Sequence, residues 1–119
     1  KGADVLSSQG VGVIDAAIEK NVWAIGAMTD QNFMGPDVVL TSVMWDIYPC
    51  VKRVVQEVLD GTWTNENRSY GISDNSVYLS DFHGLDSNIP AEVLEKVNQK
   101  FEDIKSGKFE VVHDISDIN

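Results

Sequence analysis

Apolar and polar positions follow one another along the first third of the chain in the order expected of strand, helix and strand. A short apolar run at 3–8 is followed by apolar residues at helical spacing over 11–21 and by a second apolar run at 22–28. Asn21 is suited to closing the helix in the left-handed conformation. The connections are short and the strands are apolar on both faces. The pattern predicts a βαβ unit within a parallel sheet.

The middle of the chain predicts a further strand and a strongly amphipathic helix. The strand covers 37–44, after the turn at Gly35-Pro36, and the helix covers 46–60. We expect Asp46 to cap this helix and Gly61 to end it. One side of the helix is an apolar stripe of Ile47, Val51, Val54, Val55 and Val58.

The pattern weakens after this helix and recovers near the end. Short strands are expected near 69–72 and 76–80, a helix over 89–107 with Pro90 in its first turn, and a closing strand at 108–113. There is no internal repeat. The fold class predicted from these elements is α/β, a three-layer sandwich built on a parallel sheet.

Composition narrows the class of function. The 119 residues are 43% apolar, which suffices for one domain or part of one, and the net charge is −10. Lys and Arg are nowhere clustered, so nucleic acid is excluded as a partner. No apolar run approaches the ~20 residues of a membrane span. The single cysteine, Cys50, excludes an internal disulfide and a thiolate metal cage, and we expect it to be buried.

Polar residues stand where the predicted parallel strands end, which is where such sheets bind ligands. The first strand end reads "SSQGVG" and offers Ser7, Ser8, Gln9 and Gly10 at the start of a helix. The free N–H groups there favour an oxygen-rich ligand. Equally, the glycines could serve only to permit a tight turn between strand and helix.

The second and third strand ends carry different chemistry. In "GAMTDQNF" Asp30 can accept hydrogen bonds from hydroxyl groups, although it would also suit a solvated turn. In "TSVMWD" Trp45 follows a buried run. It belongs either to the core or to a flat surface that faces a ligand.

The sequence shows no catalytic constellation. His83 and His113 lie far apart, and "DFHGLD" at 81–86 is neither a metal-ligand pattern nor a nucleophile motif, so we interpret it as a surface turn. No serine lies in a nucleophile elbow. We therefore predict a protein that is not an enzyme and has neither a cofactor nor a metal ion.

Several segments, in order, resemble one family closely. These are "KGADVL", "AAIEKNVWAIGAMTDQ", "PDVVLTSVMWD", "VKRVVQEVLDGTW" and "YGISDNSVYLSDFHGLDSNIP". They are similar to the C-terminal part of the basic membrane protein family, the solute-binding lipoproteins of ABC importers that recognise purine nucleosides or purine bases. The resemblance covers nearly the whole chain.

The resemblance implies a type I periplasmic-binding-protein fold, in which two α/β lobes close over a ligand by hinge motion. It also implies a purine base or nucleoside as ligand, an ABC permease as partner, and an extracytoplasmic location with a lipid anchor upstream of this chain. A ligand sensor with the same fold is the alternative. The implied ligand-binding residues are Trp45, Ser7, Ser8, Gln9, Gly10, Gly26, Met28 and Asp30.

Two positions depart from the nucleoside-binding members that this chain resembles. Met28 stands where those members have an acid for the ribose hydroxyls, and Trp45 stands where a lysine is common. Another branch with a tryptophan there is similar to binders of free purine bases. Since stacking of a base on an aromatic ring contributes about 1–3 kcal/mol, we expect Trp45 to face the ligand.

The resemblance also divides the chain. Residues 1–37 would form a βαβ part of the second lobe, 38–62 a crossover strand and a helix packed on the first lobe, and 63–119 a return segment with the last helix and strand. We expect the chain to be a portion of a longer protein. Alone it would leave sheet edges and apolar faces open, so we expect it to dimerise or exchange segments with a second copy.

Overall fold

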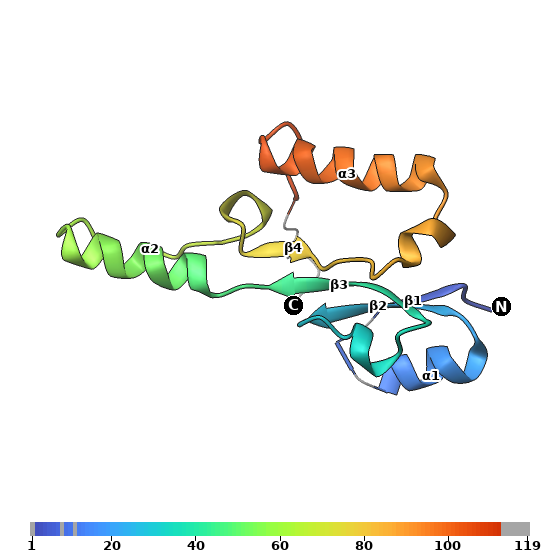
Figure 1. Cartoon of the computed structure of the whole chain (residues 1–119). Coiled ribbons are helices and arrows are strands. Elements are labelled where there is room, and N and C mark those ends of the chain that lie inside the picture. The colour runs from blue at the N-terminus through green and yellow to red at the C-terminus, as the bar shows by residue number, and fades with distance from the viewer. Residues whose placement is uncertain (1, 8, 11, 113–119) are drawn as a thin grey trace, which may run out of the picture.

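The computed structural model describes residues 2–7, 9–10 and 12–112, and it places a four-stranded sheet between helices (Figure 1). The strands are β1 (Val5–Ser7), β2 (Trp23–Met28), β3 (Val39–Trp45) and β4 (Val77–Leu79), and they lie in that order across the sheet. β1, β2 and β3 are parallel, and β4 is antiparallel to β3. The α/β class and the βαβ unit predicted from the sequence are therefore confirmed.

One face of the sheet is closed by α1 (Gly12–Lys20). The core lies here and consists of Ile14, Ala17, Ala24 and Val39, which are between 0% and 3% exposed. Asn21 ends the helix in the left-handed region, with φ 50°, as its position predicted. The Val22 N–H then donates to the Ala17 carbonyl at 3.0 Å. The chain returns directly from α1 into β2, and this keeps the βαβ unit tight.

The opposite face carries α3 (Ala91–Lys105), which lies over the sheet without closing on it (Figure 1). No residue of α3 is buried. Between helix and sheet lies an apolar cavity of about 420 Å³, lined on the sheet side by Ile25 and Val43 and on the helix side by Val93 and Val97, among others. The structure thus has three layers, and only the α1 side is packed.

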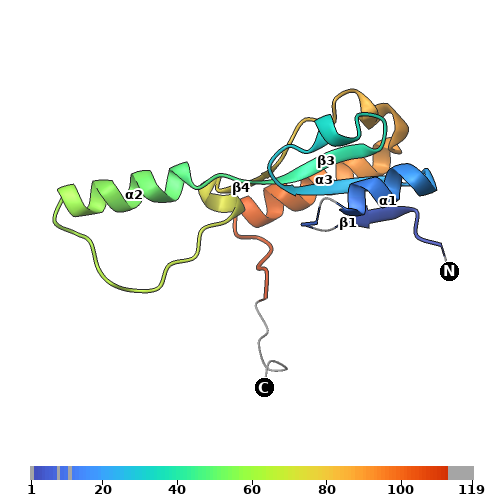
Figure 2. The same cartoon turned by 90° about the horizontal axis from the view of Figure 1, so that it is seen from below.

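The third helix, α2 (Tyr48–Leu59), projects away from the sheet (Figure 2). The N-cap residue of α2 is Ile47 rather than the predicted Asp46, whose Oδ1 accepts the Tyr48 N–H at 2.8 Å just before the helix, and Gly61 stands just after the helix with φ 68°, as expected. Its apolar stripe is uncovered: Ile47 is 73% exposed and Val58 58%. The radius of gyration is 17.4 Å, against about 13.5 Å for a compact domain of this length. The chain is therefore more extended than a compact domain of the same length.

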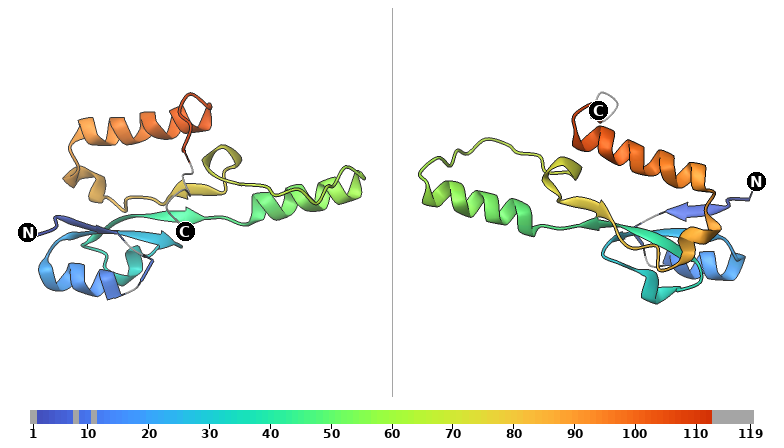
Figure 3. Two further views of the ribbon diagram at one scale, coloured as in Figure 1. Left: turned by 180° about the vertical axis from the view of Figure 1, so that it is seen from behind. Right: turned by 45° about the horizontal axis from the view of Figure 1, so that its top comes forward.

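The return segment, residues 62–71, runs back along α2 toward the sheet (Figure 3). Glu57 holds it in two ways: its carbonyl accepts the Thr62 and Trp63 N–H groups at 2.9 and 3.1 Å, and its carboxylate pairs with Arg68. Further along, the Arg53 guanidinium lies 5.9 Å from the centre of the Tyr70 ring. The arm therefore consists of α2 and the return segment bound to it, which we call the return strap.

Four further details differ from the sequence-based predictions. Residues 69–71 form no strand, and 72–74 form a short 3-10 helix, η2 (Ile72–Asp74). Residues 108–112 form no closing strand, and the expected last residue, His113, lies outside the described residues. Pro90 precedes α3 instead of lying in its first turn. Short apolar alternation becomes a strand only where a neighbouring strand is available to pair with it.

Cys50 is the fourth difference. It is partly exposed rather than buried, and its Sγ donates to the Ile47 carbonyl at 2.8 Å. The reason is that Cys50 lies on the apolar side of α2, which no other element of the described chain covers. In the described part of the chain no helix is long and apolar enough to cross a membrane.

Candidate functional site

The carboxyl ends of β1, β2 and β3 meet at one edge of the sheet, and the candidate residues lie there. Ser7 pairs with Ile25 and Met28 with Met44, so β1 ends three residues short of β2. Ser7, Gln9 and Gly10 are exposed in the space this leaves. The Gly10 carbonyl accepts the Val13 N–H at 3.1 Å and so starts α1. Ser8, also predicted at this site, lies outside the described residues.

Met28 ends β2 in an unusual backbone conformation. Its φ is 73°, and the N–H of the following residue, Thr29, donates to the Ala27 carbonyl at 2.9 Å. A left-handed φ inside a three-residue turn is strained for a residue with a side chain, at a cost on the order of 1–3 kcal/mol, and such strain clusters at ligand sites. The Met28 side chain is 47% exposed. The edge of the sheet therefore offers a soft apolar group.

Gly26 lies below this turn and is buried. A Cβ there would come within 2.5 Å of Ser42 Oγ and 2.8 Å of Gln31 Oε1. These two side chains clamp the loop, because Gln31 Oε1 accepts the Ala27 N–H and Ser42 Oγ accepts the Gln31 N–H, both at 3.0 Å. The glycine thus allows a close crossing of strand and loop. Ligand contact by Gly26 stays a prediction.

Asp30 is engaged on both carboxylate oxygens. Oδ1 accepts the Asn32 N–H at 3.1 Å, and Oδ2 lies 2.8 Å from His83 Nε2. Burial raises the pKa of Asp30, but the hydrogen bonds from Asn32 and His83 and the attraction of the imidazole hold that pKa below its ordinary value of 3.8. Asp30 is a carboxylate at neutral pH, partly exposed and available to a ligand that displaces His83.

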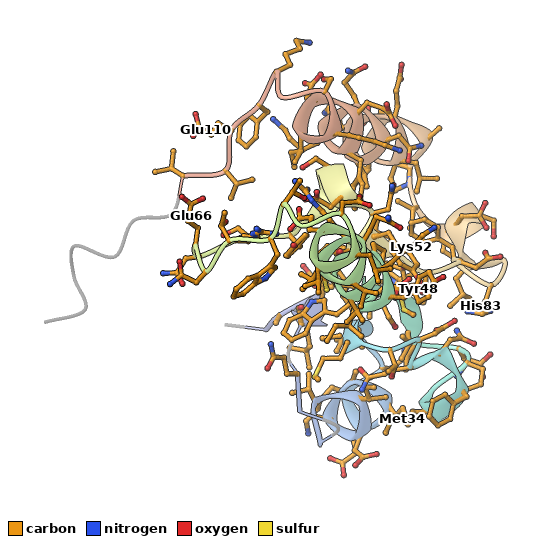
Figure 4. All side chains as sticks on the ribbon, turned by 90° about the vertical axis from the view of Figure 1, so that its left-hand side faces the viewer. Met34, Tyr48, Lys52, Glu66, His83 and Glu110 are labelled. Carbon is orange, nitrogen blue, oxygen red and sulfur yellow. The ribbon has the colours of Figure 1, made fainter. Side chains whose placement is uncertain are left out.

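His83 also lies at this edge, although the sequence assigned it no functional role. It lies in an exposed turn, as predicted for 81–86, with its N–H donating to Asp81 Oδ1 at 3.0 Å. Viewed along α2, His83 stands to one side of the sheet while Tyr48 and Lys52 lie on the arm (Figure 4). The turn was recognisable from the residues 81–86. The contact with Asp30, 53 residues earlier, had no local signal.

Trp45 ends β3 and is 51% exposed, so it is not a core residue in this structure. It lines a pocket of about 360 Å³, which we call the Trp45 pocket. A volume of this size falls in the range of small-molecule sites. The other residues that line the pocket are Asp46, Ile47, Cys50, Tyr70, Ser76 and Val77.

Potential metal ligands and catalytic groups are dispersed among the described residues. Among them no group of three or more His, Cys, Asp or Glu side chains could hold a metal ion. In the described chain, the other hydrogen bonds of the His83–Asp30 pair join it to Asp81 and to the Asn32 N–H, neither of which is a nucleophilic hydroxyl or thiol. The edge carries a half-exposed indole, an exposed thioether and a carboxylate, groups that suit a flat ligand with polar substituents, and of these only Trp45 lines the Trp45 pocket.

Comparison with known proteins places the chain among binding proteins. Residues 1–112 match the family described as ABC transporter substrate-binding protein PnrA-like. A purine-binding protein of Brucella abortus is 27% identical over 110 residues, which are 91% of this chain and 30% of that protein.

Two solved structures have similar folds. A transcriptional activator of the comK gene from Bacillus halodurans superposes with a TM-score of 0.73 at 26% identity, over 92% of this chain and 39% of that one. A solute-binding protein of an ABC transporter system from Conexibacter woesei gives 0.65 at 21%, over 93% and 38%. The chain spans about a third of the length of these relatives.

Proposed function

Because this chain belongs to the family of PnrA-like ABC transporter substrate-binding proteins, we propose that it is the C-terminal portion of a two-lobed receptor that binds a purine base or nucleoside. The match over residues 1–112 carries this proposal, and the purine-binding relative from Brucella abortus supports the ligand class. The family comprises binding proteins rather than enzymes, in agreement with the sequence-based prediction. Substrate-binding proteins of this family are typically extracytoplasmic.

The exposed arm fits the part of the fold that would reach the other lobe. We assign residues 1–37 to the second lobe, 38–62 to a crossover that docks α2 on the first lobe, and 63–119 to the return and the end of the second lobe. Two observations support this division: α2 has no buried residue, and the chain spans 30% to 39% of its longer relatives. The occupant of the apolar stripe would be the first lobe of the full-length protein.

The ligand would lie between the lobes at the carboxyl edge of the sheet. Trp45 would stack on the purine and Met28 would border it, since both are about half exposed there. Asp30 would accept hydrogen bonds from polar groups of the ligand, and Ser7, Ser8, Gln9, Gly10 and Gly26 would line the neighbouring strand ends. The full-length receptor would be held to the membrane by lipidation and would deliver its ligand to an ABC permease.

Calorimetric titration of the full-length protein with adenine, guanine, adenosine and guanosine tests this proposal. We expect one of these purines to bind and Trp45→Ala to weaken its binding by about 1–3 kcal/mol. Trp63→Ala is the matched control, because Trp63 is also 51% exposed but lies on the return strap, outside the pocket. Absence of binding by the wild-type protein to all four purines would refute the ligand class.

Ligand sensing is the second candidate function. The superposition on the comK activator favours it, with a TM-score of 0.73 at 26% identity. A sensor would use the same cleft and closure but would report the ligand to a regulatory partner. A pull-down with the ligand-loaded full-length protein as bait, which can capture either an ABC permease or a regulator, separates the two functions. Ligand-dependent capture of the permease supports transport, and capture of a regulator instead supports sensing.

A further inference from the structure

Two buried hydroxyl groups next to Trp45 have no hydrogen-bond partner among the described residues. They are the Ser76 Oγ and the Tyr70 hydroxyl, and Ser76 is only 7% exposed. A buried polar group without a partner costs about 1–3 kcal/mol, and most such groups in native proteins are paired. Two of them beside an exposed tryptophan therefore require an explanation.

Both residues line the Trp45 pocket. Ser76 is fixed beside Trp45, because its carbonyl accepts the Asp46 N–H at 2.8 Å and its neighbour Val77 pairs with Trp45 across the sheet. Tyr70 stands on the wall between this pocket and a larger cavity of about 740 Å³ near the end of α3. The residues that carry the indole and the two orphan hydroxyls thus line one concavity, and the hydroxyl oxygens themselves are buried in its wall.

The two hydroxyls are held in place by the surrounding structure. The Ser76 N–H donates to the Gly71 carbonyl at 3.0 Å. The Tyr70 ring lies under the Arg53 guanidinium, which is itself held by Glu57 at 3.2 Å and Asp74 at 3.4 Å. Groups fixed in this way before a ligand arrives lose little entropy when they bind it. The residues that carry the two hydroxyls are therefore already in position before a ligand binds.

We propose that Ser76 and Tyr70 form the polar half of the Trp45 pocket and hydrogen-bond the edge of the heterocycle that stacks on Trp45. This inference rests on the proposed function and adds to it the residues that select the ligand. A hydroxyl both donates and accepts, so the pair suits the amino, keto and ring-nitrogen groups of a purine edge. A hydrocarbon ring of the same shape would leave both hydroxyls unpaired and would be rejected.

The test uses the full-length protein and whichever of adenine, guanine, adenosine and guanosine the wild type binds. Ser76→Ala and Tyr70→Phe should each weaken that binding about 2- to 10-fold, the loss of one hydrogen bond. Without ligand, neither variant should melt at a lower temperature, because each removes an unsatisfied group. The matched controls are Ser73→Ala and Tyr78→Phe, which change exposed residues outside the pocket and should leave affinity unchanged.

The outcomes are distinguishable. Wild-type binding with unchanged affinity in both variants overturns the inference and leaves the proposed function in place. A lower melting temperature of the ligand-free variants, in parallel with the loss of affinity, also overturns it, because the hydroxyls then have partners within the protein. If the wild type binds none of the four purines, the proposed function itself fails, and the subsite falls with it.

Discussion

Helices α1 and α2 have similar sequence patterns and opposite environments. Both are amphipathic, with apolar residues at helical spacing. In α1 these residues are buried against the sheet, with Ile14 3% and Ala17 0% exposed, whereas in α2 the corresponding residues Val51 and Val55 are 50% and 52% exposed. The contrast shows that an apolar stripe predicts a contact without identifying the partner. For α1 the partner lies within this chain.

The two faces of the sheet repeat the contrast. The α1 face is closed by a short connection on each side of the helix, which leaves the helix no room to move off the sheet. The α3 face is reached through residues 46–90, which include the α2 arm, the return segment and β4, and it retains an apolar cavity of about 420 Å³. Packing is complete on the α1 face, where elements that are adjacent in the sequence contact each other. It is incomplete on the α3 face, where we infer that the first lobe, or a part of the second lobe upstream of this chain, is required.

The two helices should differ most in how far an introduced charge lowers the free energy of unfolding. In the 119-residue chain, Ala17→Asp should lower the free energy of unfolding by about 3–5 kcal/mol, because the carboxylate would be buried without a partner. Val55→Asp, which introduces the same group on the exposed face of α2, should change the free energy of unfolding of the monomeric chain by no more than about 0.5 kcal/mol. Urea denaturation measures both. Equal losses would contradict the contrast between the faces.

Self-association of the chain tests whether its exposed apolar faces bind a second copy. We expect sedimentation velocity of the isolated 119-residue chain to show a dimer or larger species, since contiguous apolar surface of this kind drives pairing. Val55→Asp should shift the distribution toward the monomer by placing a charge in the stripe. A compact wild-type monomer at all concentrations would count against this prediction.

The strand–loop crossing at Gly26 should show a smaller effect. Gly26→Ala places a methyl group within 2.5 Å of Ser42 Oγ and 2.8 Å of Gln31 Oε1, so the loop must move, at a cost of about 1–3 kcal/mol. Gly12→Ala is the control, because no atom lies within 4 Å of the added group. Thermal unfolding of both variants measures the difference. Equal melting temperatures would show that the clamp of Gln31 and Ser42 is loose.

The smallest effect is expected at the contact between Asp30 and His83. The pKa of Asp30 is lowered in the folded protein, so its stabilising contribution is complete above the ordinary value of 3.8 and is lost as pH falls through the lower folded value. His83→Ala should remove part of this contribution, by less than about 1 kcal/mol because the pair is partly exposed. Unfolding curves between pH 2 and pH 6 should therefore converge for the two proteins at the acid end.

Where the sequence predicted correctly, the signal was local. The βαβ unit follows from periodic apolar positions and short connections, and the helix ends follow from Asn21, Gly61 and Gly107, which all adopt a left-handed φ. Each of these features depends on residues a few positions apart, so each can be predicted from the sequence alone. The prediction of a short strand at 69–72 was wrong, because a strand forms only when it can pair with a neighbouring strand.

The candidate site divides in the same way. The sequence alone determined that Ser7, Met28, Asp30 and Trp45 end neighbouring parallel strands, and therefore that they share one edge of the sheet. Only the tertiary structure decided that Trp45 is half exposed, that His83 reaches Asp30, and that the buried Ser76 hydroxyl has no hydrogen-bond partner among the described residues. The physical reason is distance along the chain: such contacts form only when loops of tens of residues close, and no local pattern records how they do so.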